Sequence, residues 1–412
     1  MPAWALYDWA NSAFATLVQT FVFAAYFTRQ VADDEITGTA QWGYATAAAA
    51  LVVALSGPLL GAVADQGGRR KPFIAVFTAL GVAATAALWF VGPGGLGVLP
   101  ALALVAAATV GVELAVVFYN AMLPDLVPAQ RIGRWSGWGW GLGYAGGLAC
   151  LVVALFGFIE EPGWLDLPRD GAAHVRATFV LTAVWLALFS LPLFLLTPDR
   201  PSRGKGAARA LRDGVAQLLG SLARVRDYAV IVRFLLARML FIDGLATLFA
   251  FGGVYAAGAF DMDERQVLLF GIALNATAGA GAFAFAWIDD RLGSRATMLW
   301  SLAGLMASSA ALLLVRDPLW FWGFGMLLGV FVGPVQSASR SYLARAAPAP
   351  LRTEMFGLFA LSGKATAFLG PLLVGWVTVA AASQRAGMAT ILVFFAAGAA
   401  LLFTVPEQRT AR

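Results

Sequence analysis

The stretch Gly61-Ala62-Val63-Ala64-Asp65-Gln66-Gly67-Gly68-Arg69-Arg70-Lys71 closes one long apolar run and precedes the next. A second stretch, Ala286-Trp287-Ile288-Asp289-Asp290-Arg291-Leu292-Gly293-Ser294-Arg295, stands in the same kind of position late in the chain. When the two are superimposed, Asp65 falls on Asp290, Gly68 on Gly293 and Arg70 on Arg295. An acid, a glycine and a base in the same order after an apolar run predict a duplicated membrane unit.

The composition indicates that lipid is the solvent for most of the protein surface. Of the 412 residues, 60% are hydrophobic and only 12% are charged, and the mean hydropathy is +0.77. Soluble proteins average about 25% charged residues, so this chain has too little charge to coat a soluble protein of its length. The single Cys150 excludes an intrachain disulfide and the single His174 excludes a His-rich metal cluster, so we expect no metal and no other cofactor.

Apolar runs of about 20 residues, the length that crosses a bilayer as a helix, recur along the whole chain. We therefore predict an all-α integral membrane protein with twelve transmembrane helices in two pseudo-symmetric six-helix bundles. The predicted spans are 4–28, 41–64, 72–91, 96–119, 134–158, 175–197, 229–257, 265–288, 296–315, 318–340, 353–379 and 386–404. Gly92-Pro93-Gly94-Gly95 separates the third span from the fourth, as a tight helix reversal requires.

The cations are unevenly distributed between the two sides of the predicted membrane. Most of the 28 lysines and arginines fall on the side that holds both termini, whereas the opposite loops hold acids such as Asp33-Asp34-Glu35 and Glu160-Glu161. Because cytoplasmic loops carry the cation excess, we expect both termini in the cytoplasm and the chain in the inner or plasma membrane. The net charge of +5 is then a topology signal, and no nucleic-acid partner is expected.

The longest hydrophilic stretch, 198–228, joins the sixth and seventh spans. It begins Pro198-Asp199-Arg200-Pro201-Ser202-Arg203-Gly204-Lys205-Gly206 and continues with apolar residues at helical spacing, namely Leu211, Val215, Leu218, Leu219 and Leu222. The pattern predicts a linker followed by a basic amphipathic helix on the inner leaflet. The chain then divides into an N-terminal bundle (1–197), the linker (198–228) and a C-terminal bundle (229–412).

Twelve spans, a central basic loop and the order Gly61, Asp65, Gly68, Arg69, Arg70 after the second span resemble the major facilitator superfamily, although Gln66 stands where that family usually has Arg. Three longer segments are more specific. They are Trp4-Ala5-Leu6-Tyr7-Asp8-Trp9-Ala10-Asn11-Ser12-Ala13-Phe14, Gly137-Trp138-Gly139-Trp140-Gly141-Leu142-Gly143-Tyr144-Ala145-Gly146-Gly147, and Gln336-Ser337-Ala338-Ser339-Arg340-Ser341 ahead of Phe356-Gly357 and Ser362-Gly363-Lys364. Together they resemble the branch of the autophagy-related vacuolar amino-acid effluxers and their bacterial relatives. This resemblance implies a transporter whose first, fourth, seventh and tenth helices line a central cavity.

Polar residues are rare in the spans, where an ionisable group costs about 2.5–3.5 kcal/mol at a helix centre. In the first span Asp8, Asn11, Ser12 and Gln19 share one face. This stripe predicts either a cavity-lining face for substrate or protons, or a hydrogen-bonded seam to a neighbouring helix.

The fourth span carries Thr109, Glu113 and Asn120 on one face. Glu113 is a candidate for proton coupling or substrate binding, with a structural ion pair as the alternative.

In the seventh span Arg238 and Asp243 lie five residues apart, about 140° around a helix, so they do not pair well with each other. A zwitterionic amino acid offers a partner to both. At the end of the tenth span Gln336 and Ser337 are candidates for the cavity, and Arg340 is a candidate for a cytoplasmic gate or a lipid headgroup contact.

In the eleventh span Lys364 lies roughly 16 Å from the inner end. A lone ammonium is costly there, so we expect a carboxylate partner or an anionic substrate group. In the repeat Lys364 aligns with Tyr144, a further candidate for the substrate site.

The duplicated stretches are interpreted as conformational latches, in which each carboxylate accepts hydrogen bonds from a helix N-terminus or an Arg when the cytoplasmic side is closed. The alternative is that they only set the topology. The predicted latch residues are Gly61, Asp65, Gly68, Arg69, Arg70, Asp290, Arg291, Gly293, Arg295 and Arg340.

The function expected from these features is secondary active transport of a small polar solute, with amino acids as the implied substrate class. Protons are the expected coupling ion, membrane lipids the expected surroundings, and a monomer the expected unit. A lipid or lipophilic-drug carrier of the same fold and a non-transporting sensor are the alternatives. An enzyme is not expected, because the chain holds one histidine, one cysteine and no paired-carboxylate motif.

Overall fold

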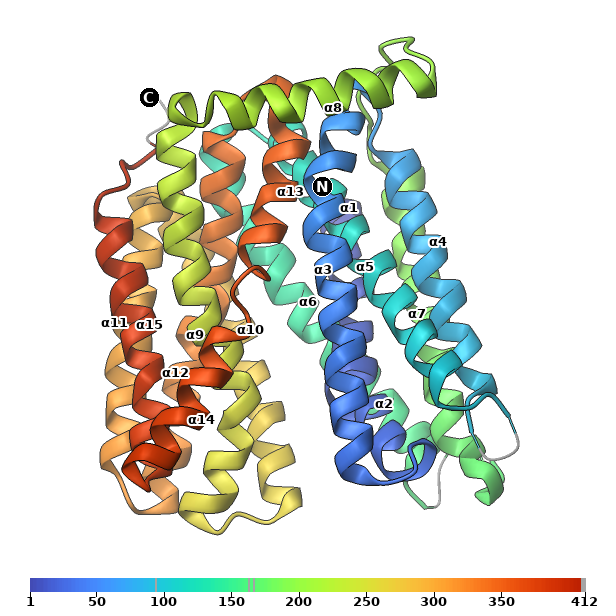
Figure 1. The fold of residues 1–412 in the computed structure, drawn as a ribbon, viewed down its shortest axis with the longest axis vertical. Helices are drawn as coiled ribbons and strands as arrows, with labels where there is room; N and C mark the ends of the chain where they lie inside the picture. Colours follow the sequence, from blue (N-terminus) through green and yellow to red (C-terminus); the bar gives the residue numbers. More distant parts are fainter. Residues whose placement is uncertain (93–94, 162–163, 166, 409–412) are drawn as a thin grey trace.

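The protein is all-helical in the computed structural model, which describes residues 1–92, 95–161, 164–165 and 167–408 (Figure 1). Apart from one isolated bridge between Val91 and Leu96, these residues contain no β-structure. Eleven helical segments are long and apolar enough to cross a membrane, and one further apolar helix is shorter. The predicted fold class is therefore confirmed.

The first six spans run from Pro2 to Leu196, and the first of them alternates α- and π-helical segments. Their bounds are α1 (Pro2–Phe14), η1 (Ala15–Phe21), α2 (Phe23–Tyr26), η2 (Phe27–Val31), α3 (Glu35–Gly67), α4 (Lys71–Ala87), α5 (Val98–Leu126), α6 (Ile132–Ala154) and α7 (Ala173–Leu196). The six that follow are α9 (Ala229–Phe260), α10 (Glu264–Leu292), α11 (Ser294–Leu314), α12 (Pro318–Ala346), the pair α13 (Arg352–Ser362) and α14 (Leu369–Ala381), and α15 (Gln384–Phe403). We refer to 1–197 and 229–412 as the N-half and the C-half.

Several helices extend beyond the predicted apolar runs, because polar end residues complete the terminal turns. The α3 helix begins at Glu35 rather than near 41, since the Asp34 side chain accepts hydrogen bonds from the Ile36 and Thr37 amides. Of the predicted reversal after the third span, Pro93 and Gly94 lie outside the described residues.

The eleventh span was predicted as one helix over 353–379, and this was wrong. The helix stops at Ser362 and resumes at Leu369. Pro371 has no N–H to offer the carbonyl four residues earlier, and Gly363 and Gly370 lower the cost of leaving the helix on either side. The two pieces have different neighbours. The α13 helix packs on α3 and α5 of the N-half, whereas α14 packs on α15 and α9 of its own half.

Three helix pairs make the main contacts between the halves: α3 with α13, α6 with α10, and α6 with α12. The backbones of α3 and α13 come close together at Gly57 and Gly357, where a Cβ atom added to Gly57 would lie 3.5 Å from the Gly357 Cα atom. The start of α1, the end of α15 and the whole of α8 lie at one end of the bundle (Figure 1). We call this the latch end and the opposite end, where α3 begins and α14 finishes, the far end.

The amphipathic helix predicted in the linker is present as α8 (Ala207–Ala223), which lies across the latch end (Figure 1). Its Gly214 packs against Val63 of α3. Leu211, Leu219 and Leu222 on α8 are each at least half exposed, as an apolar face on a membrane surface requires.

Candidate functional site

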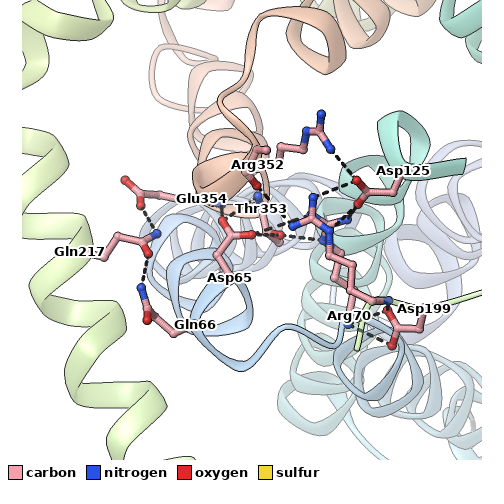
Figure 2. A network of polar contacts seen from close by, with 11 residues as sticks. Asp65, Gln66, Arg70, Asp125, Asp199, Gln217, Arg352, Thr353 and Glu354 are labelled. Carbon is pink, nitrogen blue, oxygen red and sulfur yellow. Dashed lines mark hydrogen bonds and ion pairs between the residues drawn. The ribbon is translucent and has the colours of Figure 1, made fainter. Parts of the chain in front are cut away.

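The first latch joins the end of α3 to the start of α13 across the two halves (Figure 2). The buried Asp65 carboxylate accepts hydrogen bonds from the Thr353 amide at 2.9 Å, the Thr353 hydroxyl at 2.7 Å and the Glu354 amide at 3.0 Å. A carboxylate on the free amides of a helix start is stabilised by those donors and by the helix dipole. Gly61, one turn earlier, lets the backbones approach, because a Cβ there would overlap the Thr353 carbonyl.

Arginines surround Asp125 beside this latch (Figure 2). The Arg70 guanidinium donates to Thr353 at 2.9 Å and to Asp125 at 2.5 Å. Arg200 and Arg352 also bind the Asp125 carboxylate. Burial lowers the pKa of Arg70 from its ordinary value, and Asp125 opposes that shift. The predicted residues Asp65 and Arg70 therefore lie in one cross-half network, and Asp125 is a member that the motif did not indicate.

The second latch joins the end of α10 to the start of α6. Asp290 lies beside Gly133, where a Cβ would come within 2.8 Å of the Asp290 Oδ1 atom. Arg345 of its own half lies 3.1 Å from Asp290, and Arg134 of the N-half lies 3.6 Å away. Asp289 also binds Arg345, at 2.7 Å. The two latches thus connect equivalent helix ends in opposite directions.

Apart from Arg340, which is described below, the remaining predicted latch residues lie within their own half or at the surface. Gly68 and Gly293 end α3 and α10 at positive φ, 90° and 95°. Arg295 donates to the Leu402 and Phe403 carbonyls within the C-half. Arg69 and Arg291 are exposed.

Asp199 and Glu407 occupy equivalent positions in the two repeats. Asp199 accepts from the Arg70 and Lys71 amides at the start of α4. Glu407 accepts from the Arg295 and Ala296 amides at the start of α11. In each repeat, an acid that follows the last span therefore caps the N-terminus of the helix that forms the third span.

Arg340 connects the halves deeper in the bundle. Its guanidinium contacts the Asp8 carboxylate at 2.9 Å, the Asn120 side-chain oxygen at 3.2 Å and the Ser136 carbonyl at 2.6 Å. It also lies 5.1 Å from the Trp4 ring centroid, a cation–π distance. Arg340 is 2% exposed and Asp8 is 9% exposed. Asp8, a candidate for a free cavity carboxylate, is therefore held in a buried cross-half ion pair.

Lys364 has a carboxylate partner, as its depth in the membrane led us to expect. Its ammonium nitrogen lies 2.7 Å and 2.8 Å from the two oxygens of Glu113 on α5. The side chains are 22% and 29% exposed, respectively. Lys364 stands in the break between α13 and α14, so this pair crosses between the halves where the eleventh span changes neighbours.

A cavity of about 270 Å³ lies toward the far end from these pairs. Among the predicted residues it is lined by Ser12 and Tyr144, and it also contains Asn275, which the sequence did not single out. The Gln336 amide donates to the Tyr144 hydroxyl at 3.0 Å. The cavity is therefore bordered by α1, η1, α6, α9 and α10.

Other predicted cavity residues have hydrogen-bond partners in the protein. Asn11 donates to the Tyr7 carbonyl and Ser337 donates to the Pro334 carbonyl, each within its own helix. Gln19 donates to Thr109 on α5, which is the one of these three contacts that joins the stripe on the first span to a neighbouring helix.

Arg238 and Asp243 do not pair with each other. Arg238 donates to the Phe359 carbonyl at 2.7 Å and the Ser362 hydroxyl at 2.8 Å. Asp243 is 1% exposed, and among the residues that the structure describes no cation pairs with its carboxylate.

The arrangement of helices defines the class of protein. The structure of the major facilitator superfamily transporter FucP in the outward conformation aligns with a TM-score of 0.76 at 11% identity, covering 98% of each chain. That of the human organic anion transporter MFSD10 (TETRAN) gives 0.75 at 18% identity, covering 97% of this chain and 98% of that one. The fold is therefore that of a major facilitator superfamily transporter.

Sequence similarity places the chain within this class. The model of the family described as vacuole effluxer Atg22 like matches residues 29–412, so the chain belongs to that family. The uncharacterized MFS-type transporter YxiO of Bacillus subtilis (strain 168) is 28% identical over 409 residues, which cover 98% of this chain and 94% of that protein. Autophagy-related protein 22-1 of Penicillium rubens is 24% identical over 268 residues, covering 60% of this chain and 44% of the fungal protein. The predicted family is confirmed, and the chain is an MFS-type transporter.

Proposed function

We propose that this transporter moves a small zwitterionic solute, with amino acids as the substrate class, by alternating access coupled to protons. It acts as a monomer in the inner or plasma membrane, with the latch end in the cytoplasm. The closed latches then make the present conformation the outward-open one. The excess of Lys and Arg at the latch end supports this orientation.

The observation that carries the proposal is the Glu113–Lys364 pair. It offers one carboxylate and one ammonium at membrane depth, on opposite halves and partly exposed. An amino acid carries the complementary charges, so its ammonium can replace Lys364 at Glu113 and its carboxylate can replace Glu113 at Lys364. Bound substrate would then replace a contact that otherwise joins the halves, and so would change how strongly the halves are held together.

The test is uptake of a panel of radiolabelled amino acids, sugars and lipophilic cations into proteoliposomes, with and without an imposed pH gradient. We expect uptake of at least one amino acid, stimulated by the gradient. Uptake confined to sugars or lipophilic cations would contradict the substrate class.

The doubly neutral variant Glu113→Gln with Lys364→Gln tests the pair itself. It removes both charges together and so leaves no unpaired buried charge. Losing charged hydrogen bonds of about 1.5–3 kcal/mol should lower amino-acid uptake about tenfold or more. The matched control is Asp227→Asn, on the linker side of α9. Uptake by the double variant at the control level would contradict a recognition role.

A lipophilic cargo is the second candidate, favoured by a cavity of about 200 Å³ that adjoins the first one and shares part of its lining with it. It is lined mainly by apolar side chains, including Phe249, Phe270, Leu274, Phe321 and Met388. If this cavity holds the cargo, Phe270→Ala should abolish lipophilic-cation uptake while the double variant retains it.

A further inference from the structure

The break in the eleventh span leaves an acidic group with no counter-charge. Asp243 lies near the middle of α9 and is 1% exposed, and no cation of the described residues pairs with its carboxylate. Asp8 and Glu113, the other candidate coupling carboxylates, are both paired with cations. A carboxylate without a cationic partner at this depth is costly to keep charged.

The α9 helix contacts the break at both ends, the end of α13 and the start of α14. Arg238 donates to the Phe359 carbonyl and the Ser362 hydroxyl at the end of α13, where the helix dipole favours a cation. Five residues later, Asp243 lies beside the first turn of α14, since a Cβ on Gly370 would come 3.2 Å from the Asp243 carbonyl. A change at Asp243 therefore acts on the segment at which the eleventh span changes neighbours.

Thr366, within the break, is the polar side chain next to the Asp243 carboxylate. Its hydroxyl is buried and faces that carboxylate. Discontinuous helices in transporters supply freed backbone carbonyls of the kind that bind small cations. A carboxylate without a cationic partner, the hydroxyl beside it and a non-helical segment thus meet at one place.

The charged groups around this place are engaged elsewhere. Arg238 is bound to the end of α13, and Lys364 of the break is bound to Glu113 on α5. From α15, Phe394 and Phe395 approach Gly244, the residue next to Asp243. Within the described part of the chain, α10, α12 and α14 contribute no ion-pair partner to Asp243.

We propose that Asp243 and Thr366 form a binding site for a small monovalent cation, a proton or Na⁺, whose occupancy sets the conformation of the break in the eleventh span. The inference rests on the proposed ion-coupled transport for its role. The site itself is tested without any solute, so its failure and that of the proposed substrate class are distinguishable.

The experiment uses the purified full chain in detergent, as wild type and as Asp243→Asn, which keeps the side-chain shape but carries no charge. Thermal unfolding is followed across a pH series in sodium chloride or choline chloride at equal ionic strength. Infrared difference spectra report a protonated carboxylic acid, and radioactive sodium reports Na⁺ binding.

If the site takes a proton, wild type shows a buried carboxylic-acid band that Asp243→Asn lacks, and its unfolding temperature falls as pH rises while that of the variant does not. If it takes Na⁺, sodium raises the unfolding temperature of wild type only, and wild type alone binds radioactive sodium. Both results support the site. Wild type and Asp243→Asn that behave alike in all three measurements would overturn it.

Thr366→Ala provides a second test that does not depend on Asp243→Asn folding. Removing a hydroxyl that binds a charged site should weaken cation affinity about tenfold, and Thr366→Ser should restore it. The matched control is Thr85→Ala, which removes another buried hydroxyl, on α4 of the N-half. Equal affinities in Thr366→Ala and Thr85→Ala would contradict the assignment of Thr366.

Discussion

The two latches start from the same sequence pattern but hold their carboxylates differently. Asp65 accepts three hydrogen bonds from Thr353 and Glu354 at a helix start of the other half. Asp290 lies at the equivalent helix start beside Gly133, and its ion-pair partners are arginines, one from each half. The repeated motif thus preserves a carboxylate at a helix start of the other half, while the side chains around that carboxylate differ. The first latch should contribute more to closure, because Asp65 accepts three hydrogen bonds from a helix of the other half.

Asp65→Ala should have the largest effect. It removes the cap of α13 and leaves the buried Arg70 with one carboxylate fewer, a loss of about 3 kcal/mol. The population closed at the latch end should fall about 100-fold, and transport should slow with little change in substrate affinity. The readout is the distance between spin labels at Arg69 and Arg291, placed in a Cys150→Ser background. A loss of affinity without a change of rate or distance would contradict the latch.

Gly61→Ala should open the same latch by steric overlap. Its Cβ would collide with the Thr353 carbonyl, and overpacking of this kind costs about 1–3 kcal/mol. Gly67→Ala, on the same helix, is the matched control, since a Cβ there meets nothing within 4 Å. The same label pair should lengthen in Gly61→Ala only. Equal distances in the two variants would show that the contact is not close in the membrane.

Asp290→Ala should have a smaller effect, about 1 kcal/mol or fivefold in the closed population, because Asp289 still binds Arg345. Asp290→Asn serves as its conservative control. An effect as large as that of Asp65→Ala would remove the proposed difference between the latches.

Lys205→Gln should have the smallest effect. The Lys205 ammonium, 2.5 Å from Asp213, holds the pKa of that exposed carboxyl below its ordinary value. A carboxyl whose pKa is lowered on folding stabilises the folded state at pH values above its ordinary pKa. This stabilisation is lost as pH falls through the pKa of the folded state. The rate of protease cleavage of the linker should differ between Lys205→Gln and wild type by no more than about twofold. This difference should therefore vanish in acid. A difference that grows on acidification would contradict this sign.

The sequence predicted the architecture because apolar run length alone decides where a chain crosses a bilayer. It also singled out Asp65 and Asp290 as latch carboxylates and Arg340 as a candidate gate, since a charge beside or within a span needs a partner. It did not pair Lys364 with Glu113 or Arg340 with Asp8. Those pairings depend on how two bundles face each other, which no pattern within one helix encodes.

The break in the eleventh span was hidden for a related reason. Gly363, Gly370 and Pro371 occur in an apolar run that otherwise reads as one helix, and glycine and proline are common in membrane helices. The packing of α13 and α14 on different halves decides that the helix breaks there. Thr366 drew no attention in the sequence because a hydroxyl in a continuous helix satisfies itself on the preceding turn.

The most direct test is a pair of distances measured in the same protein, in lipid bilayers. One joins labels at Arg69 and Arg291 at the latch end, and the other joins labels at Ile36 and Val379, both exposed at the far end. Comparing wild type with the double variant Asp65→Ala and Asp290→Ala, we predict that the first distance lengthens while the second shortens. Two distances that lengthen together, or that both stay fixed, would contradict two halves that rock about a shared centre.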